Sequence, residues 1–196
     1  MIVDVYIAPI PAGEPGEVFP PQRQAQLDET KNAQHRRQRY FVWKLLEYGL
    51  RQSRGLDMNR LEFSLDDRGR WSCKECFFSL SHTKGAVAVA VSHAPVGVDL
   101  ECADRKLHPS LPGKLLTDGE RSAFAAMDAR AQNRYLLEKW CKKESLFKWQ
   151  EAAAGEPKAQ PCTGLETVAG QTYCWSVMTD DPTQLRILKT EDDIWN

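Results

Sequence analysis

The sequence contains no long hydrophobic run. No segment approaches the roughly 18 consecutive apolar residues that a membrane-spanning helix requires. A secretory signal is also missing, because residues 1–5 include no basic segment followed by an apolar run. From these absences we expect a cytoplasmic protein with no membrane partner.

The sequence has no excess of either charge. Lys and Arg number 26 and Asp and Glu number 27, so the formal net charge is -1. Proteins that bind nucleic acids in bulk need a basic excess to neutralise phosphates. We therefore expect no nucleic acid partner, although a balanced total is compatible with a local basic patch for a small anion.

The cysteines lack the spacing of a disulfide framework or of a zinc site. The 6 cysteines are scattered along a chain of 196 residues, which favours free thiols in a reducing compartment. Cys73 and Cys76 form a single CxxC pair, without the second Cys pair or His pair that is typical of zinc sites. The sequence alone therefore assigns no metal or redox role to these two residues.

The predicted elements follow the order helix then strands, twice over, although no clear sequence repeat is visible. We expect an α+β fold of two similar halves, residues 1–96 and 97–196. Four central strands separated by short turns predict an antiparallel meander. Hydrophobic periodicity predicts strands at 1–9, 61–65, 77–80, 86–91, 96–101, 173–177 and 185–187, and helices at 22–51, 117–127 and 132–154.

The predicted strand at residues 96–101 carries two acidic residues on one face. Residues two apart in a strand point the same way, so Asp99 and Glu101 lie opposite Val98 and Leu100. Neighbouring carboxylates repel each other unless a cation lies between them, and Mg²⁺ prefers such oxygen ligands. The alternative is an edge strand whose acidic face is solvated.

The last predicted helix carries a carboxylate on its apolar face. At 100° per residue, Glu144 falls inside the arc of Trp140 and Phe147, and Lys143 and Lys148 flank that arc. A buried carboxylate is costly unless it has a charged partner or a metal. Either the two lysines are structural ion partners, or Glu144 meets a cation and the lysines meet phosphates.

Two further groups of polar residues complete this hypothesis. Ser81 and His82 close the predicted strand that precedes the acidic strand by a short hairpin, so both can share one end of the sheet. Arg37, Lys44 and Arg51 lie seven residues apart on the first long helix, as a solvated basic face or as an anion-binding strip. Carboxylates surrounded by basic groups predict a magnesium–phosphate site.

Three motifs, in order, resemble those of the 4'-phosphopantetheinyl transferases of the larger pseudo-dimeric type, typified by the surfactin-synthetase activator. Residues 78–82, Phe-Ser-Leu-Ser-His, resemble F-N-[IL]-S-H. Residues 97–101, Gly-Val-Asp-Leu-Glu, resemble G-[IV]-D-[IVL]-E. Residues 140–148, Trp-Cys-Lys-Lys-Glu-Ser-Leu-Phe-Lys, resemble W-[STC]-x-K-E-[AS]-x-x-K at every fixed position. The C-terminal part of the chain carries no such motif.

This resemblance implies two α+β halves related by a pseudo-twofold, with the active site in the cleft between them. The N-terminal half would hold the nucleotide of coenzyme A, and the C-terminal half the magnesium and the catalytic helix. Mg²⁺ would be held by Asp99, Glu101 and Glu144. The coenzyme A ligands that the resemblance implies are Lys44, Arg70, Ser81, His82, Lys143 and Lys148, with Ser81 and His82 at the 3'-phosphate.

The chain also departs from the family pattern. Trp71 stands where the family has proline, Ser79 where it has asparagine, and Trp43 where it often has glycine. Glu120 matches a further family acid, but it also completes a capping box that begins at Thr117.

The implied reaction moves the phosphopantetheinyl group of coenzyme A to a serine of an apo acyl, peptidyl or polyketide carrier protein and releases 3',5'-ADP. The predicted catalytic residues are Glu144 as proton acceptor or metal ligand, Lys148 as a stabiliser of charge, and Asp99. We expect a monomer, because one chain contains both halves. A magnesium-dependent pyrophosphohydrolase would show an acid-rich helical repeat, which is absent, and a non-catalytic binding module would be expected to lack at least one of the three carboxylates.

Overall fold

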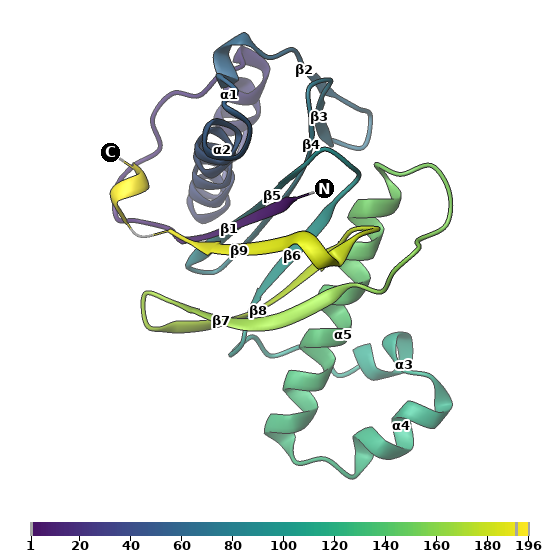
Figure 1. Ribbon diagram of the computed structural model, residues 1–196. Coiled ribbons are helices and arrows are strands. Elements are labelled where there is room, and N and C mark those ends of the chain that lie inside the picture. Colours follow the sequence, from purple (N-terminus) through teal and green to yellow (C-terminus); the bar gives the residue numbers. More distant parts are fainter. Residues whose placement is uncertain (1, 191, 196) are drawn as a thin grey trace.

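The computed structural model describes residues 2–190 and 192–195 and confirms the predicted α+β fold (Figure 1). No helix in these residues is both long and apolar enough to cross a membrane. The helices are α1 (Pro21–Asp28), α2 (Ala33–Arg54), α3 (Leu111–Leu115), α4 (Asp118–Ala125) and α5 (Ala129–Gln150), with short 3-10 helices η1 (Met58–Arg60), η2 (Pro182–Gln184) and η3 (Asp192–Trp195). The strands are β1 (Val3–Pro9), β2 (Phe63–Leu65), β3 (Trp71–Cys73), β4 (Phe77–Thr83), β5 (Ala86–Ser92), β6 (Gly97–Cys102), β7 (Cys162–Val168), β8 (Gln171–Met178) and β9 (Leu185–Lys189).

One topology occurs twice along the chain. In the first unit, β1, α2, β4 and β5 follow one another, and the strands lie in the order β4-β5-β1. In the second unit, β6, α5, β7 and β8 follow one another, and the strands lie in the order β6-β8-β7. In both units the third strand pairs antiparallel with the other two, and both long helices have 22 residues. The two units therefore share a topology, although their sequences show no clear repeat.

The predicted meander of four neighbouring strands is wrong. β4 and β5 form a hairpin, but β2 pairs with β3 in a separate ribbon and β6 pairs with β8. β9 pairs in parallel with β1, so the C-terminal segment returns to the N-terminal sheet across the boundary expected at residue 96. Alternation of apolar residues predicts a strand and its faces, whereas the partner strand is chosen by long-range packing.

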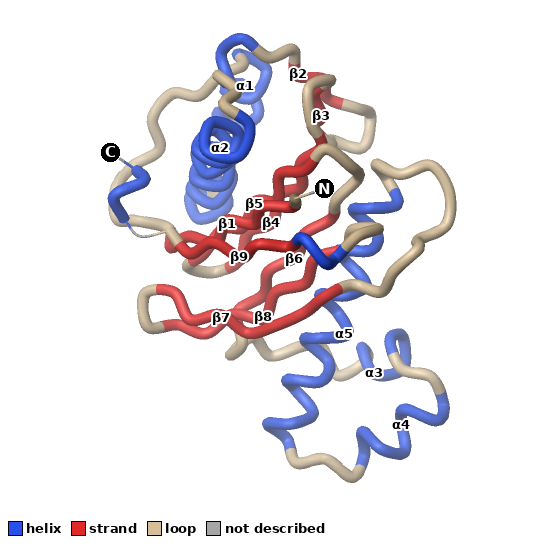
Figure 2. Tube along the Cα trace, in the orientation of Figure 1, coloured by secondary structure: helices blue, strands red, loops and turns tan. Residues whose placement is uncertain are grey.

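The single helix predicted at residues 22–51 is also wrong. The chain leaves helical geometry after Asp28, and α2 starts anew where the Asn32 side chain accepts a hydrogen bond from the backbone N–H of His35 at 2.9 Å. Asn at an N-cap satisfies one of the unpaired N–H groups of the first turn. Two helices therefore replace one, and α1 can lie at an angle to α2 (Figure 2).

The central strand β5 separates two hydrophobic cores. Its valines, Val87, Val89 and Val91, pack against the apolar face of α2. Its alanines, Ala86, Ala88 and Ala90, face the second sheet and pack against the cluster of β6 and β8. The small side chains on this second face allow the two sheets to approach closely, which brings β4 and β6 side by side.

Side-chain hydroxyl groups of β4 join it to β6. Backbone N–H groups of β6 donate to these hydroxyls, in the pairs Val98 to Ser79 at 3.0 Å, Leu100 to Ser81 at 3.1 Å and Cys102 to Thr83 at 3.4 Å. Buried N–H groups require a partner, so the alternating hydroxyls of β4 take the place of a backbone ladder. This hydroxyl junction positions the acidic strand against the N-terminal half.

Ser79→Ala is expected to lower the free energy of unfolding by about 1–3 kcal/mol, because the buried N–H group of Val98 loses its acceptor. Chemical denaturation of both proteins measures this difference. Ser72→Ala is the matched control, because Ser72 is exposed on β3. Equal losses in the two variants would show that the hydroxyl junction does not stabilise the fold.

Candidate active site

A cavity of about 490 Å³ lies where the two halves meet. Its walls come from α1, α2, the β2–β3 turn, β4 and the C-terminal half of α5. They include five cationic side chains, Arg23, Arg39, Arg68, Arg70 and Lys148, against two acidic ones, Glu144 and Glu151. This excess of positive charge in a concave site favours an anionic ligand.

Arg23 is the deepest of these cations, with 6% of its surface exposed. Its guanidinium lies 4.7 Å from the ring centre of Trp43 and donates to the backbone oxygen of Arg39 at 2.6 Å and to Gln26 at 3.2 Å. No carboxylate of the described residues pairs with it, and its buried Nε has no hydrogen-bond partner among them. Burial lowers the pKa of Arg23 to about 10, so the side chain stays charged at pH 7. A buried charge without a counterion is costly, and an anion in the cavity would compensate it.

His82 contributes to the cavity, whereas Ser81 does not. Neighbouring residues of a strand point to opposite faces, so the Ser81 hydroxyl points toward β6 and donates to Asp99 at 3.0 Å. The structure therefore gives no support to a contact between the Ser81 hydroxyl and the phosphate that His82 is predicted to bind. The His82 side chain is exposed at the cavity, where the surrounding protein groups, and then the positive charge of Lys148, lower its pKa to about 4, so the free site holds a neutral imidazole at pH 7.

Asp99 and Glu101 are buried on β6, facing β4 and α5. Lys148 donates to Oδ1 of Asp99 at 2.8 Å and to the backbone oxygen of Val98 at 2.9 Å. The second oxygen of Asp99, Oδ2, is buried without a hydrogen-bond partner among the described residues. A buried carboxylate oxygen without a hydrogen bond indicates a missing partner.

Glu101 is held by neighbours from β4, from α5 and from the loop after β6. Its oxygens accept from the indole N–H of Trp140 at 3.2 Å and from the hydroxyl of Thr83 at 3.3 Å, and Arg105 forms an ion pair with it. These contacts fix the carboxylate on the same face of β6 as Asp99.

Glu144 lies on α5, half-buried at the cavity wall. Partial burial raises the pKa of its carboxyl group, and the negative charges of Asp99 and Glu101 raise it further. Glu144 makes no hydrogen bond or ion pair with any described residue, since Lys148 pairs with Asp99 and Lys143 lies over the ring of Trp140. The alternative of a structural ion pair with either lysine is therefore not supported.

The three carboxylates fit a divalent cation by their chemistry. The described residues contain no ready-made group of three acidic, Cys or His side chains at metal-binding distances. However, Asp99 Oδ2 lacks a partner among the described residues, and burial, followed by repulsion from Asp99 and Glu101, raises the pKa of Glu144. A cation between them would relieve both costs, and Mg²⁺ prefers such oxygen ligands.

The predicted inward arc of α5 is shifted by almost a quarter turn. The buried side chains of α5 are Leu136, Leu137, Cys141, Ser145 and Trp149, whereas Phe147 is 53% exposed. The reason is a close backbone approach to Gly97, which draws the Ser145 face of the helix onto β6. Glu144 consequently borders the cavity instead of being buried in the core.

Besides Ser81, two further predicted coenzyme A ligands lie outside the cavity walls. Lys44 forms an ion pair with Glu47 on α2, and Lys143 stacks over Trp140 at 5.9 Å. Arg70, His82 and Lys148 do line the cavity.

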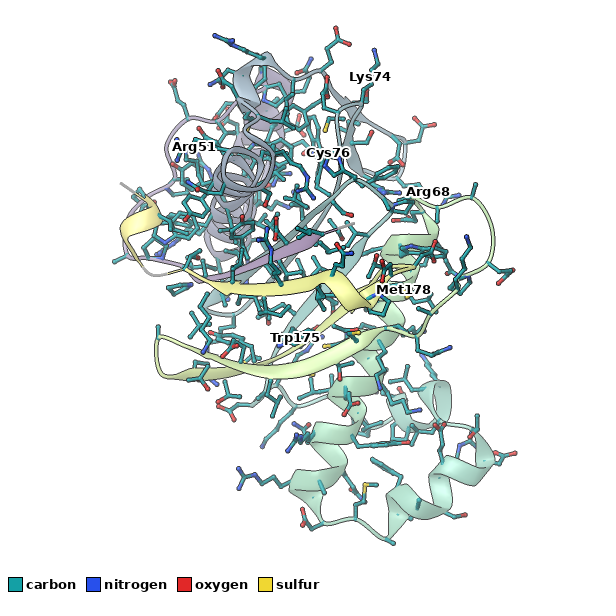
Figure 3. All side chains as sticks on the ribbon, in the orientation of Figure 1. Arg51, Arg68, Lys74, Cys76, Trp175 and Met178 are labelled. Atoms are coloured by element: carbon teal, nitrogen blue, oxygen red, sulfur yellow. The ribbon has the colours of Figure 1, made fainter. Side chains whose placement is uncertain are left out.

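Sequence reasoning missed Arg23, Arg39 and Arg68. No motif or periodicity distinguishes these residues from the many surface arginines. Figure 3 shows Arg68 beside the C-terminal end of α5, where its guanidinium lies 4.0 Å from Glu151.

Glu120 accepts from Thr117 in the predicted capping box, and Lys139 of α5 forms an ion pair with it. These bonds hold α4 against α5, and none of the three residues lines the cavity. The structure thus supports the capping alternative for Glu120.

Comparison with known protein families finds a match for the part of the chain that carries the three carboxylates and Lys148. Residues 95–170 match the 4'-phosphopantetheinyl transferase superfamily. The match to this transferase superfamily spans less than half of the 196 residues and covers β6, α5 and β7. It includes Asp99, Glu101, Glu144 and Lys148, but none of the cavity residues from the N-terminal half. No curated protein matches the chain.

Proposed function

We propose that this protein is a 4'-phosphopantetheinyl transferase of the larger, two-halved type. It transfers the phosphopantetheinyl group of coenzyme A to a serine of an apo carrier protein, in a magnesium-dependent reaction. One observation carries the proposal: the cationic cavity adjoins the carboxylates, because Glu144 and Lys148 border the cavity and also neighbour Asp99. A polyanionic nucleotide needs the cationic cavity, and a cation bound to its phosphates needs the neighbouring carboxylates.

The N-terminal half binds the phosphate-rich nucleotide end of coenzyme A. Arg23 is the strongest candidate, since its buried charge lacks a counterion. Arg39, Arg70 and His82 line the same cavity and are expected to share the phosphates. Lys44 is replaced in this role by Arg23, because Lys44 lies outside the cavity walls.

Asp99, Glu101 and Glu144 would hold Mg²⁺, which neutralises charge on the diphosphate when it is bound. The oxygen of the carrier serine forms a bond to the β-phosphorus of coenzyme A, and the bond to the 3',5'-ADP oxygen breaks. Glu144 accepts the proton of the serine hydroxyl, and its raised pKa favours this role. Lys148, anchored on the backbone oxygen of Val98, neutralises charge that develops at the phosphate.

The shared topology of the two units supports a pseudo-twofold relation between them and a monomeric enzyme. The family resemblance implies that the carrier protein docks near α4. Acyl, peptidyl and polyketide carrier proteins all present a serine at the start of a helix, so this feature does not distinguish them. An experiment must therefore identify the carrier protein and its pathway.

The deciding experiment is incubation with coenzyme A, Mg²⁺ and a panel of apo carrier proteins, followed by intact mass measurement. We expect one carrier to gain one phosphopantetheinyl group and 3',5'-ADP to appear in equal amount. Excess EDTA should abolish transfer. Release of 3',5'-ADP without any modified carrier would indicate a hydrolase, and binding of coenzyme A without turnover on any carrier would indicate a non-catalytic module.

His82→Ala is expected to weaken coenzyme A binding about ten- to a hundredfold, the range for one charge-assisted hydrogen bond. The affinity for 3'-dephospho-coenzyme A should change little, because the lost partner is the 3'-phosphate. Calorimetry on both ligands makes the comparison, with His93→Ala as control because His93 is exposed outside the cavity. Equal weakening of both ligands by His82→Ala would place His82 away from the 3'-phosphate.

A further inference from the structure

The turn between β3 and β4 holds two thiol groups in contact. Cys73 is the last residue of β3, and Cys76 directly precedes β4. Their sulfur atoms lie 3.8 Å apart, and the Cys73 thiol lies 3.4 Å from the backbone oxygen of Cys76. All cysteines of the chain are free. This pair is the CxxC motif to which the sequence alone assigns no role.

The geometry of this turn permits a bond between the two sulfurs. A disulfide has an S–S distance of about 2.05 Å, so the sulfurs need to approach by somewhat less than 2 Å. Only Lys74 and Glu75 separate the two cysteines, and the ladders of β3 and β4 extend no further into the turn than Cys73 and Phe77. Rotation of the two side chains and a small adjustment of the turn close this gap without loss of a strand pairing.

The two thiols differ in access and acidity. Cys73 is half-exposed and Cys76 is buried, yet both border a small cavity of about 260 Å³ that adjoins Arg70 and Trp71. The hydrogen bond from the Cys76 thiol lowers the pKa of Cys73 to about 7, and the same contact, followed by burial, raises the pKa of Cys76. A thiolate is the attacking form in thiol–disulfide exchange. Cys73 is therefore the attacking residue and Cys76 the resolving one.

We propose that Cys73 and Cys76 form a dithiol site that exchanges with disulfides of low-molecular-mass thiols, such as oxidised glutathione, and closes into an intrachain disulfide. The Cys73 thiolate attacks one sulfur of oxidised glutathione, whose S–S bond breaks and releases one glutathione thiolate. Cys76 then loses its proton to the released thiolate or to water and attacks Cys73 Sγ, and the second glutathione leaves as a thiolate that is protonated. In total two electrons pass from the protein to oxidised glutathione, and two glutathione molecules are formed.

This proposal does not depend on the proposed transferase activity, and its test uses no coenzyme A. The folded full-length protein is incubated with glutathione buffers of increasing oxidised fraction, quenched with acid, alkylated and mapped by peptide mass. We expect the peptide that contains Cys73 and Cys76 to lose both alkylation sites together. Its mass should be two hydrogen atoms below that of the same peptide with two free, unalkylated thiols. This should occur at a lower oxidised fraction than any change at the half-exposed Cys162.

Single variants identify the order of the two steps. Cys76→Ser should accumulate one glutathione on Cys73, because no second thiol is left in the turn to attack the mixed disulfide. Cys73→Ser should leave Cys76 unmodified, since that thiol is buried. Cys162→Ser is the matched control and should oxidise like the unchanged protein.

Three results would overturn the proposal. The first is that Cys73 and Cys76 of the unchanged protein remain reduced while Cys162 reacts. The second is that a glutathione on Cys73 of the unchanged protein persists and no disulfide closes. The third is that Cys76 reacts at the same rate with and without Cys73.

Discussion

Glu144→Gln is expected to lower the rate of phosphopantetheinyl transfer at least about a hundredfold, because the variant loses both a proton acceptor and a carboxylate ligand. The fold should be retained, since Glu144 makes no hydrogen bond or ion pair with any described residue. Coenzyme A should still bind through the cations of the N-terminal half. Transfer to an apo carrier protein, with coenzyme A affinity measured separately, tests this result.

The raised pKa of Glu144 gives a second measurement on the same variant. In the native state this carboxyl group binds a proton more tightly than in the unfolded chain, where its pKa has the ordinary value of 4.5. The free energy of unfolding therefore falls as the pH rises from below 4.5 through the raised pKa. Without magnesium, Glu144→Gln is expected to be at least as stable as the unchanged protein at pH 7, and the difference should vanish below pH 4.5.

Glu138→Gln on the same helix is the matched control. Glu138 pairs with Lys142 on the surface of α5 and does not line the cavity. Its replacement should cost about 0–1 kcal/mol of stability and leave transfer unchanged. Normal turnover by Glu144→Gln would refute its catalytic assignment, and a large loss of stability without magnesium would identify Glu144 as a structural residue.

Gly97→Ala is expected to cause the largest loss of stability among single methyl additions at glycines with a negative φ. A Cβ atom on Gly97 would lie 1.9 Å from the backbone oxygen of Ser145 and 2.7 Å from the backbone N of Trp149. Neither atom belongs to a flexible side chain, so β6 and α5 must separate. The free energy of unfolding should fall by about 3 kcal/mol or more, at the upper end of overpacking effects.

The same substitution should also reduce activity in the fraction that folds. Lys148 reaches Asp99 and Val98 across the β6–α5 contact, so separation of the two elements displaces Lys148 and Glu144 from the carboxylates. Gly119→Ala is the control, because nothing lies within 4 Å of its added methyl group and Gly119 lies within α4. That variant is expected to be more stable by about 0.4–1 kcal/mol. Equal stability of Gly97→Ala and the unchanged protein would show that the close approach is not required.

The sequence by itself determined the local features that depend on short-range physics. A run of small apolar residues predicted β5, alternating apolar residues predicted β6, and the spacing of Asp99 and Glu101 placed both carboxylates on one face. The capping box at Thr117 was confirmed, because a cap needs only residues three positions apart. The same alternation also implies that Ser81 and His82 point to opposite faces, although the motif suggested a shared ligand.

Only the tertiary structure decided which strands and charges meet. β6 pairs with β8, more than 70 residues away, and β9 returns to β1 from the far end of the chain. Arg23, Arg39 and Arg68 reach one cavity from three separate segments, and no local pattern marks them. The inward face of α5 depends on the absence of a side chain at Gly97. Such features arise from packing between segments that are distant in the sequence, where the free energy depends on the partner surface and not on the periodicity of either segment alone.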